Sequence, residues 1–333
     1  MQHSTRYILC FLLAALLGVS CKKDEYKLPT ASNKLQDEGL KRTLGPNIVG
    51  QPIEFAYAMA ILPSKGKLVS CTAVASIAGA PGTYMENKSY FTDVNQSGKD
   101  SGVLVGSPSV TSGTTTTVDY TVDTSAATLR YFYIIPEEAR GKSVTITFTA
   151  KSSDGESIST KMGPYTISNM DILVKQKVTN KGNMYISIGD MKIYDSAGAA
   201  ANAGSIDLVY LYRTYTTSTF NHALVAPAAD PMYLPDVILP AGVNRDTRML
   251  KVFNLHDHNL APDEQYGDSF IDDVDLQKID LTGDPDYAIN LKQDAGVWVE
   301  TADGKYKAFV FINSIATNTA TIGIKRLAIN SSK

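Results

Sequence analysis

Alternation of apolar and polar residues with a period of two is the feature that most constrains this chain. In VTITFTA (144–150), apolar residues alternate with threonines. Successive side chains of a strand point to opposite faces, so this pattern predicts a strand with one buried and one wet face. LRYFYII (129–135) is apolar or aromatic on both faces, which is typical of a central strand. Such strands recur without a helical period, which predicts an all-β chain whose residues 47–168 form an immunoglobulin-like β-sandwich.

Residues 169–333 are predicted to form a second β-rich domain with long loops. The strand candidates in this domain are 184–188, 206–212, 297–302, 306–312 and 321–329. Six prolines lie between Phe220 and Asp286. Proline cannot donate a backbone hydrogen bond, so this stretch is expected to lack long helices and central strands. Long loops in compact domains are often functional, which makes the stretch a first place to look for a site.

The N-terminus predicts export and a lipid anchor. Thirteen apolar residues (7–19) follow a short leader with one arginine, too few for a helix that spans a bilayer. Residues 1–20 therefore indicate a signal peptide, and Cys21 follows a small Ser20 where lipidation occurs. Several acyl chains on Cys21 would anchor the protein stably. Residues 21–46 are polar and without periodicity, so we expect a lipidated tether.

Charge and cysteine content exclude some classes of protein. The chain has 31 basic and 34 acidic residues, and this lack of a basic excess argues against nucleic-acid binding. If Cys10 leaves with the signal peptide and Cys21 carries lipid, Cys71 is the one remaining thiol and no intramolecular disulfide can form. Cys71 lies in an apolar stretch and is expected to be a small buried side chain.

Ordinary catalytic motifs are absent, so we expect a non-catalytic protein without a cofactor. For two features of the sequence, a histidine pair and an acidic segment, a metal site is the alternative interpretation. His256 and His258 would point the same way in an extended strand. Residues 257–286 contain ten acids and one base, and carboxylates such as Asp272, Asp273 and Asp275 are ligands that suit Ca²⁺. An exposed loop and a solvated acidic face are the default interpretations.

The C-terminal sequence GVWVETADGKYKAFVFIN predicts a hairpin with a two-residue Asp303-Gly304 turn. This register places Val297, Val299, Ala308 and Val310 on one face, which must face the core. The opposite face carries a charge pair near the turn and three aromatic residues farther away, namely Glu300, Lys307, Trp298, Phe309 and Phe311. Either another part of the chain covers these aromatics, or they form a platform for a sugar ring.

Several segments resemble an uncharacterised family of Bacteroidota surface lipoproteins. The segments are IEFAYAMAILPSKGKLVSCTAVASIAGA, LRYFYIIPEEARGK, KMGPYTIS and NHALVAPAA. The lipobox-like LLGVSC with the following Lys23-Asp24-Glu25 resembles the signal that sends lipoproteins of these bacteria to the exterior of the outer membrane. The layout is similar to that of surface glycan-binding lipoproteins of polysaccharide-utilisation systems. This resemblance implies a location but no catalytic residue.

The leading hypothesis is therefore a cell-surface lipoprotein that binds carbohydrate without catalysis, with an outer-membrane transporter as a candidate partner. The alternative is a structural adhesin or fimbrillin-like pilus subunit. For that alternative, cleavage at Lys41-Arg42 would release an N-terminal segment and allow strand exchange between subunits.

Overall fold

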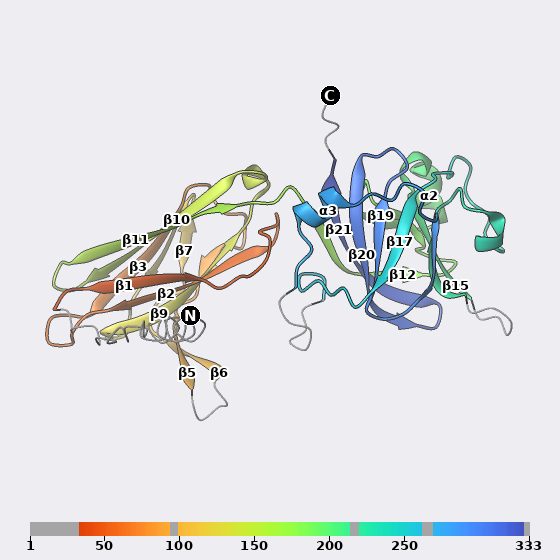
Figure 1. Ribbon diagram of the computed structural model, residues 1–333. Coiled ribbons are helices and arrows are strands. Elements are labelled where there is room, and N and C mark those ends of the chain that lie inside the picture. The colour runs from red at the N-terminus through yellow and green to blue at the C-terminus, as the bar shows by residue number, and fades with distance from the viewer. Residues whose placement is uncertain (1–32, 94–98, 214–219, 262–268, 330–333) are drawn as a thin grey trace, which may run out of the picture. The chain divides into compact units, whose positions relative to one another are not determined.

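The computed structural model describes residues 33–93, 99–213, 220–261 and 269–329. The predicted signal peptide, Cys21 and the start of the predicted tether lie outside the described residues. The described chain is almost entirely β, which confirms the prediction of an all-β protein with a sandwich followed by a second β-rich domain (Figure 1). No helix among the described residues is long and apolar enough to cross a membrane.

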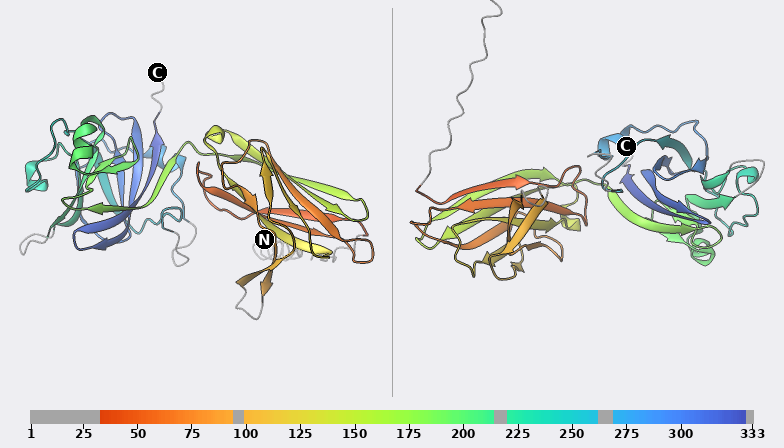
Figure 2. Two further views of the ribbon diagram at one scale, coloured as in Figure 1. Left: turned by 180° about the vertical axis from the view of Figure 1, so that it is seen from behind. Right: turned by 90° about the horizontal axis from the view of Figure 1, so that it is seen from below.

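The first domain is a sandwich of two antiparallel sheets (Figure 2). One sheet has the order β1 (Gln36–Lys41), β2 (Pro52–Ala60), β9 (Ala126–Ile134) and β4 (Tyr84–Met85). The other has the order β11 (Ser157–Thr166), β10 (Ser143–Ser152), β3 (Leu68–Ala75), β8 (Thr115–Asp119) and β7 (Val110–Ser112). A separate hairpin of β5 (Lys88–Asp93) and β6 (Lys99–Leu104) projects from this domain (Figure 1).

Aromatic rings fill the centre of the first domain. Phe148 lies 4.8 Å from Tyr57 and 5.7 Å from both Phe55 and Tyr131, measured between ring centroids. All four side chains are fully or almost fully buried, and each comes from a strand whose burial alternates. The period of two thus places the large rings in one layer between the sheets. Cys71 is completely buried as predicted, and burial raises the pKa of its thiol.

The predicted tether is wrong for residues 36–41, because they form edge strand β1. β1 pairs along its length with β2, and the hydroxyl of Tyr57 donates a 2.7 Å hydrogen bond to Asp37. Every second side chain of β1 is only half-buried and the others are exposed, so no apolar periodicity marks the strand in the sequence. Lys41 of the dibasic pair is the last residue of β1.

The described part of the second domain has two antiparallel sheets, each with five strands (Figure 2). The first has the order β12 (Asp171–Thr179), β21 (Thr319–Ala328), β20 (Tyr306–Ala316), β19 (Ala295–Glu300) and β17 (Arg248–Phe253). The second has the order β14 (Lys192–Tyr194), β13 (Tyr185–Ser187), β15 (Leu208–Arg213), β16 (Asn221–Val225) and β18 (Tyr287–Leu291). The described residues of this domain include two short α-helices, α2 (Ser196–Ala201) and α3 (Asp273–Lys278).

Strand β16 corrects the expectation that the proline-rich stretch lacks central strands. It pairs with β15 on one edge and β18 on the other, and its last four residues are buried. The run HALVA (222–226) is apolar after the histidine, as a strand buried on both faces requires, and it ends before Pro227. The prolines therefore limit where strands end without excluding a strand between them.

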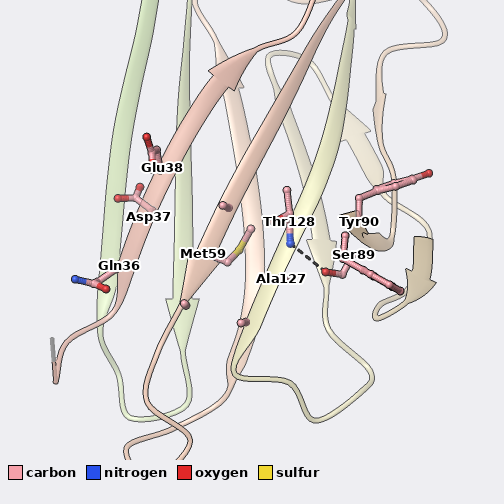
Figure 3. Close-up of a pocket in the computed structure, with 12 residues that line it drawn as sticks. Gln36, Asp37, Glu38, Met59, Ser89, Tyr90, Ala127 and Thr128 are labelled. Carbon is pink, nitrogen blue, oxygen red and sulfur yellow. Dashed lines mark hydrogen bonds between the residues drawn. The ribbon is translucent and has the colours of Figure 1, made fainter. Parts of the chain in front are cut away.

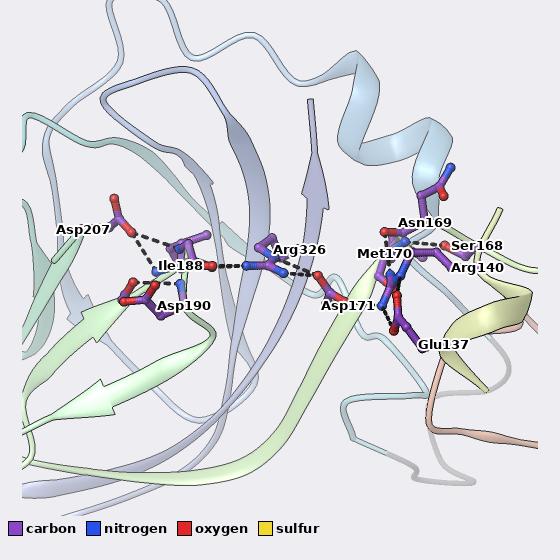
Figure 4. A network of polar contacts seen from close by, with 12 residues as sticks. Glu137, Arg140, Ser168, Asn169, Met170, Asp171, Ile188, Asp190, Asp207 and Arg326 are labelled. Carbon is purple, nitrogen blue, oxygen red and sulfur yellow. Dashed lines mark hydrogen bonds and ion pairs between the residues drawn. The ribbon is translucent and has the colours of Figure 1, made fainter. Parts of the chain in front are cut away.

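A polar network in the second domain stabilises the ends of its strands (Figure 4). Arg326 of β21 donates to Asp171 of β12 (3.0 Å) and to the carbonyl oxygen of Ile188 (3.1 Å). The backbone N–H of Ile188 donates to buried Asp207 at 2.7 Å. Burial raises the pKa of Asp207 to about 6, although Arg245 at 3.0 Å opposes this shift. These groups satisfy one another, which indicates a structural role.

Candidate functional site

The C-terminal hairpin has the predicted register. β19 pairs with β20 so that Trp298 faces Phe309, Val299 faces Ala308 and Glu300 faces Lys307. The predicted core face is also confirmed, because Val297, Val299, Ala308 and Val310 are fully buried in the main core of the second domain.

The opposite face of this hairpin is covered, so the predicted sugar platform is wrong for Phe309 and Phe311. Both side chains are completely buried and pack with Leu260, Ile271 and Leu276. Trp298 is half-buried, with its ring centroid 4.7 Å from that of Phe309. Leu260 and Ile271 come from the long connection after β17, and Leu276 comes from α3. Packing by another part of the chain is therefore the correct alternative for these aromatics.

The charged pair of this face also contacts the covering segment. The ammonium of Lys307 donates to the carbonyl oxygens of Gln277 and Ile279, at the end of α3. Glu300 is half-buried opposite Lys307. Lys307 therefore holds helix α3 against the sheet, so that Lys307 and Glu300 do not belong to a sugar platform.

The predicted metal ligands do not converge. Among the described residues, no group of three His, Cys, Asp or Glu side chains is placed to hold a metal ion. The ring of His256 lies 5.0 Å from Phe311, whereas that of His258 lies 5.5 Å from Phe270. The histidines therefore pack against different aromatic rings.

The acidic residues around α3 have structural partners. Asp272 and Asp275 form a capping box at the start of α3, where the carboxylate of Asp272 accepts backbone N–H groups. Asp273 accepts a hydrogen bond from the hydroxyl of Ser168 at 2.6 Å. Carboxylates favour the N-terminus of a helix because unpaired backbone N–H groups lie there, so the acids at 272–275 are explained without a metal.

An open groove of about 600 Å³ lies on the outer face of the β1-β2-β9-β4 sheet. Small side chains form its floor, because Ala58 and Ala60 of β2 pair with Thr128 and Ala126 of β9 on the side away from the core. Larger side chains stand on both sides of this floor, Gln36 and Glu38 from β1 and Ser89, Tyr90 and Phe91 from β5. Figure 3 shows the labelled residues of β1 and β5 on opposite sides of β2 and β9.

The β5–β6 hairpin is fastened to the sheet and so fixes one wall of the groove. The backbone N–H of Thr128 donates to the hydroxyl of Ser89 at 3.0 Å (Figure 3). Arg130 of β9 forms an ion pair with Asp100 of β6 and lies 4.2 Å from the ring centroid of Tyr90. A guanidinium over an aromatic ring is a favourable cation–π contact. Burial and the neighbouring Glu86 raise the pKa of Tyr90 to about 12, so its hydroxyl remains protonated.

The groove combines an exposed ring with groups that form hydrogen bonds. Phe91 is 50% exposed, and Gln36 and Glu38 are exposed on the opposite wall. Of the groove-lining residues, Asp37 and Glu38 are acidic and none is basic. Such a surface can stack an apolar ring face and accept hydrogen bonds from hydroxyl groups. This groove was not among the predicted sites, although alanines at every second position of IEFAYAMA indicate an outward face without large side chains.

Two family models match the chain: Domain of unknown function (DUF4466) over residues 32–167 and Domain of unknown function (DUF8576) over residues 168–329. A crystal structure of a DUF4466 family protein from Parabacteroides merdae is 45% identical. The match covers 89% of this chain and 99% of that chain, with a TM-score of 0.83. This chain belongs to the DUF4466 family. This match confirms the predicted membership of an uncharacterised protein family.

This chain also matches two pilin structures, with low similarity. The major pilin subunit BcpA of Bacillus cereus is 9% identical over 90% of this chain and 67% of that chain, with a TM-score of 0.28. The major pilin GBS80 of Streptococcus agalactiae is 8% identical over 87% of this chain and 91% of that fragment, with a TM-score of 0.29. Similarity this low carries no argument about function. No curated protein matches the chain.

Proposed function

We propose that this protein is a non-catalytic cell-surface binding protein whose ligand is a carbohydrate, bound in the groove between β1 and β5. The observation that carries the proposal is the exposed Phe91 ring beside a floor of small side chains, with exposed polar groups opposite. The apolar face of a sugar ring packs on an aromatic ring, and its hydroxyls hydrogen-bond to carboxylates and amides. The acidic lining without a basic residue favours neutral over anionic sugars.

Binding to immobilised neutral and acidic oligosaccharides tests this proposal. We expect Phe91→Ala to weaken the binding of a neutral ligand by about tenfold, because the stacking surface is lost. Val110→Ala is the matched control, since Val110 is 69% exposed on β7 of the other sheet. Equal binding by both variants and the unmodified protein would contradict the proposal that the ligand binds in this groove. Filaments in electron micrographs, without glycan binding, would favour the adhesin alternative.

The proposal includes a lipid anchor at Cys21, with the protein on the exterior of the outer membrane beside a transporter. The apolar run before Cys21 and the charged residues after it support this location. Cys21→Ala should abolish lipid attachment and leave unprocessed or soluble protein, because the thiol that carries lipid is gone. Membrane fractionation and metabolic labelling with a fatty acid measure the change. A Cys21→Ala protein that is processed normally and stays in the outer-membrane fraction would refute the anchor.

A further inference from the structure

A buried lysine in the second domain contacts both a carboxylate and an amide. The side chain of Lys325 on β21 is completely buried. Its ammonium nitrogen Nζ lies 2.5 Å from Asp257 Oδ2, 2.8 Å from Asn259 Oδ1 and 2.8 Å from the carbonyl oxygen of Ile271. Phe309 is its neighbour on strand β20. A nucleophile, an amide electrophile and a proton acceptor therefore meet at a site where the lysine is buried.

We propose that Lys325 and Asn259 become joined by an intramolecular amide bond, with Asp257 as the proton carrier. The bond would link β21 to the connection that follows β17, across 66 residues of sequence. That connection covers Phe309 and Phe311, so a covalent link would fix the cover to the sheet. Resistance to unfolding and proteolysis at an exposed surface is the expected benefit.

The reaction balances without an oxidant, a metal or a cofactor. The Lys325 ammonium first gives a proton to the Asp257 carboxylate, and rotation about the Cε–Nζ bond turns the free amine toward Asn259. Nζ attacks Asn259 Cγ and forms the new C–N bond. A second proton moves from Nζ to Nδ2, the Cγ–Nδ2 bond breaks, and ammonia leaves. The products are a secondary amide, a protonated Asp257 and ammonia, so the total charge is unchanged.

The surroundings favour this step over a permanent ion pair. Removing two charges from water is costly, and the reaction replaces a buried ion pair by neutral groups. Fixed contact between the reactants also replaces a bimolecular encounter by a unimolecular one. Burial lowers the pKa of Lys325, although Asp257 acts in the opposite direction. Asn259 is only half-buried, so ammonia has a route to solvent.

Asn259 is a better electrophile than Asp257 in this geometry. The two carboxylate oxygens of Asp257 accept hydrogen bonds from the backbone N–H groups of Leu260 (3.0 Å) and Ile271 (2.6 Å). Both oxygens therefore already have partners, and a carboxylate is a poorer electrophile for an amine than a carboxamide. Reaction at Asn259 releases ammonia, whereas reaction at Asp257 would release water.

Peptide mass spectrometry of the full chain decides the proposal. Trypsin should yield one cross-linked species of residues 252–278 and 308–326, with the summed peptide mass less one ammonia and without cleavage after Lys325. Separate unlinked peptides would overturn the proposal. A linked species that has lost water would also overturn it, because that product assigns the bond to Asp257. This measurement needs no variant, so it does not depend on the folding of one.

Variants then test the assigned roles. Asn259→Ala should abolish the cross-linked species because it removes the electrophile, and Asp257→Ala should abolish it because it removes the proton carrier. Asn313→Ala is the matched control, since the amide of Asn313 donates to the carbonyl oxygen of Leu260 in the same region. Asn313→Ala should retain the link. Retention of the link in Asn259→Ala would refute the proposal.

Discussion

Lys325→Met should lower the free energy of unfolding of the second domain by at least about 3–5 kcal/mol, because it leaves Asp257 buried without its lysine partner and also removes the amine that the proposed link requires. Lys325 and Asp257 are both completely inaccessible to solvent. The substitution also removes the contacts from Nζ to Asn259 and Ile271. Denaturant unfolding followed by Trp298 fluorescence measures the loss, since the chain has one tryptophan and it is half-buried in this domain.

Two further variants separate the buried charge from other effects. Lys305→Met changes a lysine that is 71% exposed and 3.7 Å from Asp303, so we expect less than about 1 kcal/mol of change. Lys325→Met combined with Asp257→Asn should recover part of the stability lost in the single variant, because no unpaired charge then remains buried. If Lys325→Met is as stable as Lys305→Met, Lys325 does not hold the connection after β17 against the sheet.

The buried lysine illustrates what the sequence could not predict. Lys325 lies in TATIGIKRLA, where a lysine in a strand is ordinarily assigned to the wet face. That face is buried because the connection after β17 folds back over it, and this covering depends on contacts between residues far apart in sequence. The register of the C-terminal hairpin, in contrast, was predictable residue by residue, because the short turn around Asp303-Gly304 fixes it locally. The turn itself differs from the prediction, since the backbone N–H of Gly304 donates to the carbonyl oxygen of Thr301.

In the candidate groove, too, one part follows from the local sequence and another depends on contacts between residues far apart in the chain. Alternation in β2 assigns Ala58 and Ala60 to the outward face, so the floor of the groove can be derived from sequence. The walls cannot, because β1 has no apolar period and the β5–β6 hairpin is positioned by the contacts of Arg130 with Asp100 and Tyr90. The aromatic residues near Trp298, which the sequence suggested as a platform, are instead buried by packing.

Phe148→Ala should have an effect of similar size in the first domain, with a loss of about 3–5 kcal/mol. The substitution empties the centre of an aromatic cluster, since Phe148 contacts Phe55, Tyr57 and Tyr131 from the facing sheet. A cavity forms there because the surrounding strands are fixed by their hydrogen bonds and cannot collapse onto it. Calorimetry of the full chain should show a transition lowered by on the order of 10 °C.

Phe91→Ala is the matched control, because it makes the same chemical change in the same domain at a side chain that is 50% exposed. It removes far less buried area, so its melting temperature should remain within a few degrees of that of the unmodified protein. A loss of glycan binding without a loss of stability would then assign Phe91 to the ligand. If Phe91→Ala destabilises the domain as strongly as Phe148→Ala, the Phe91 ring supports the hairpin and the groove loses its proposed binding residue.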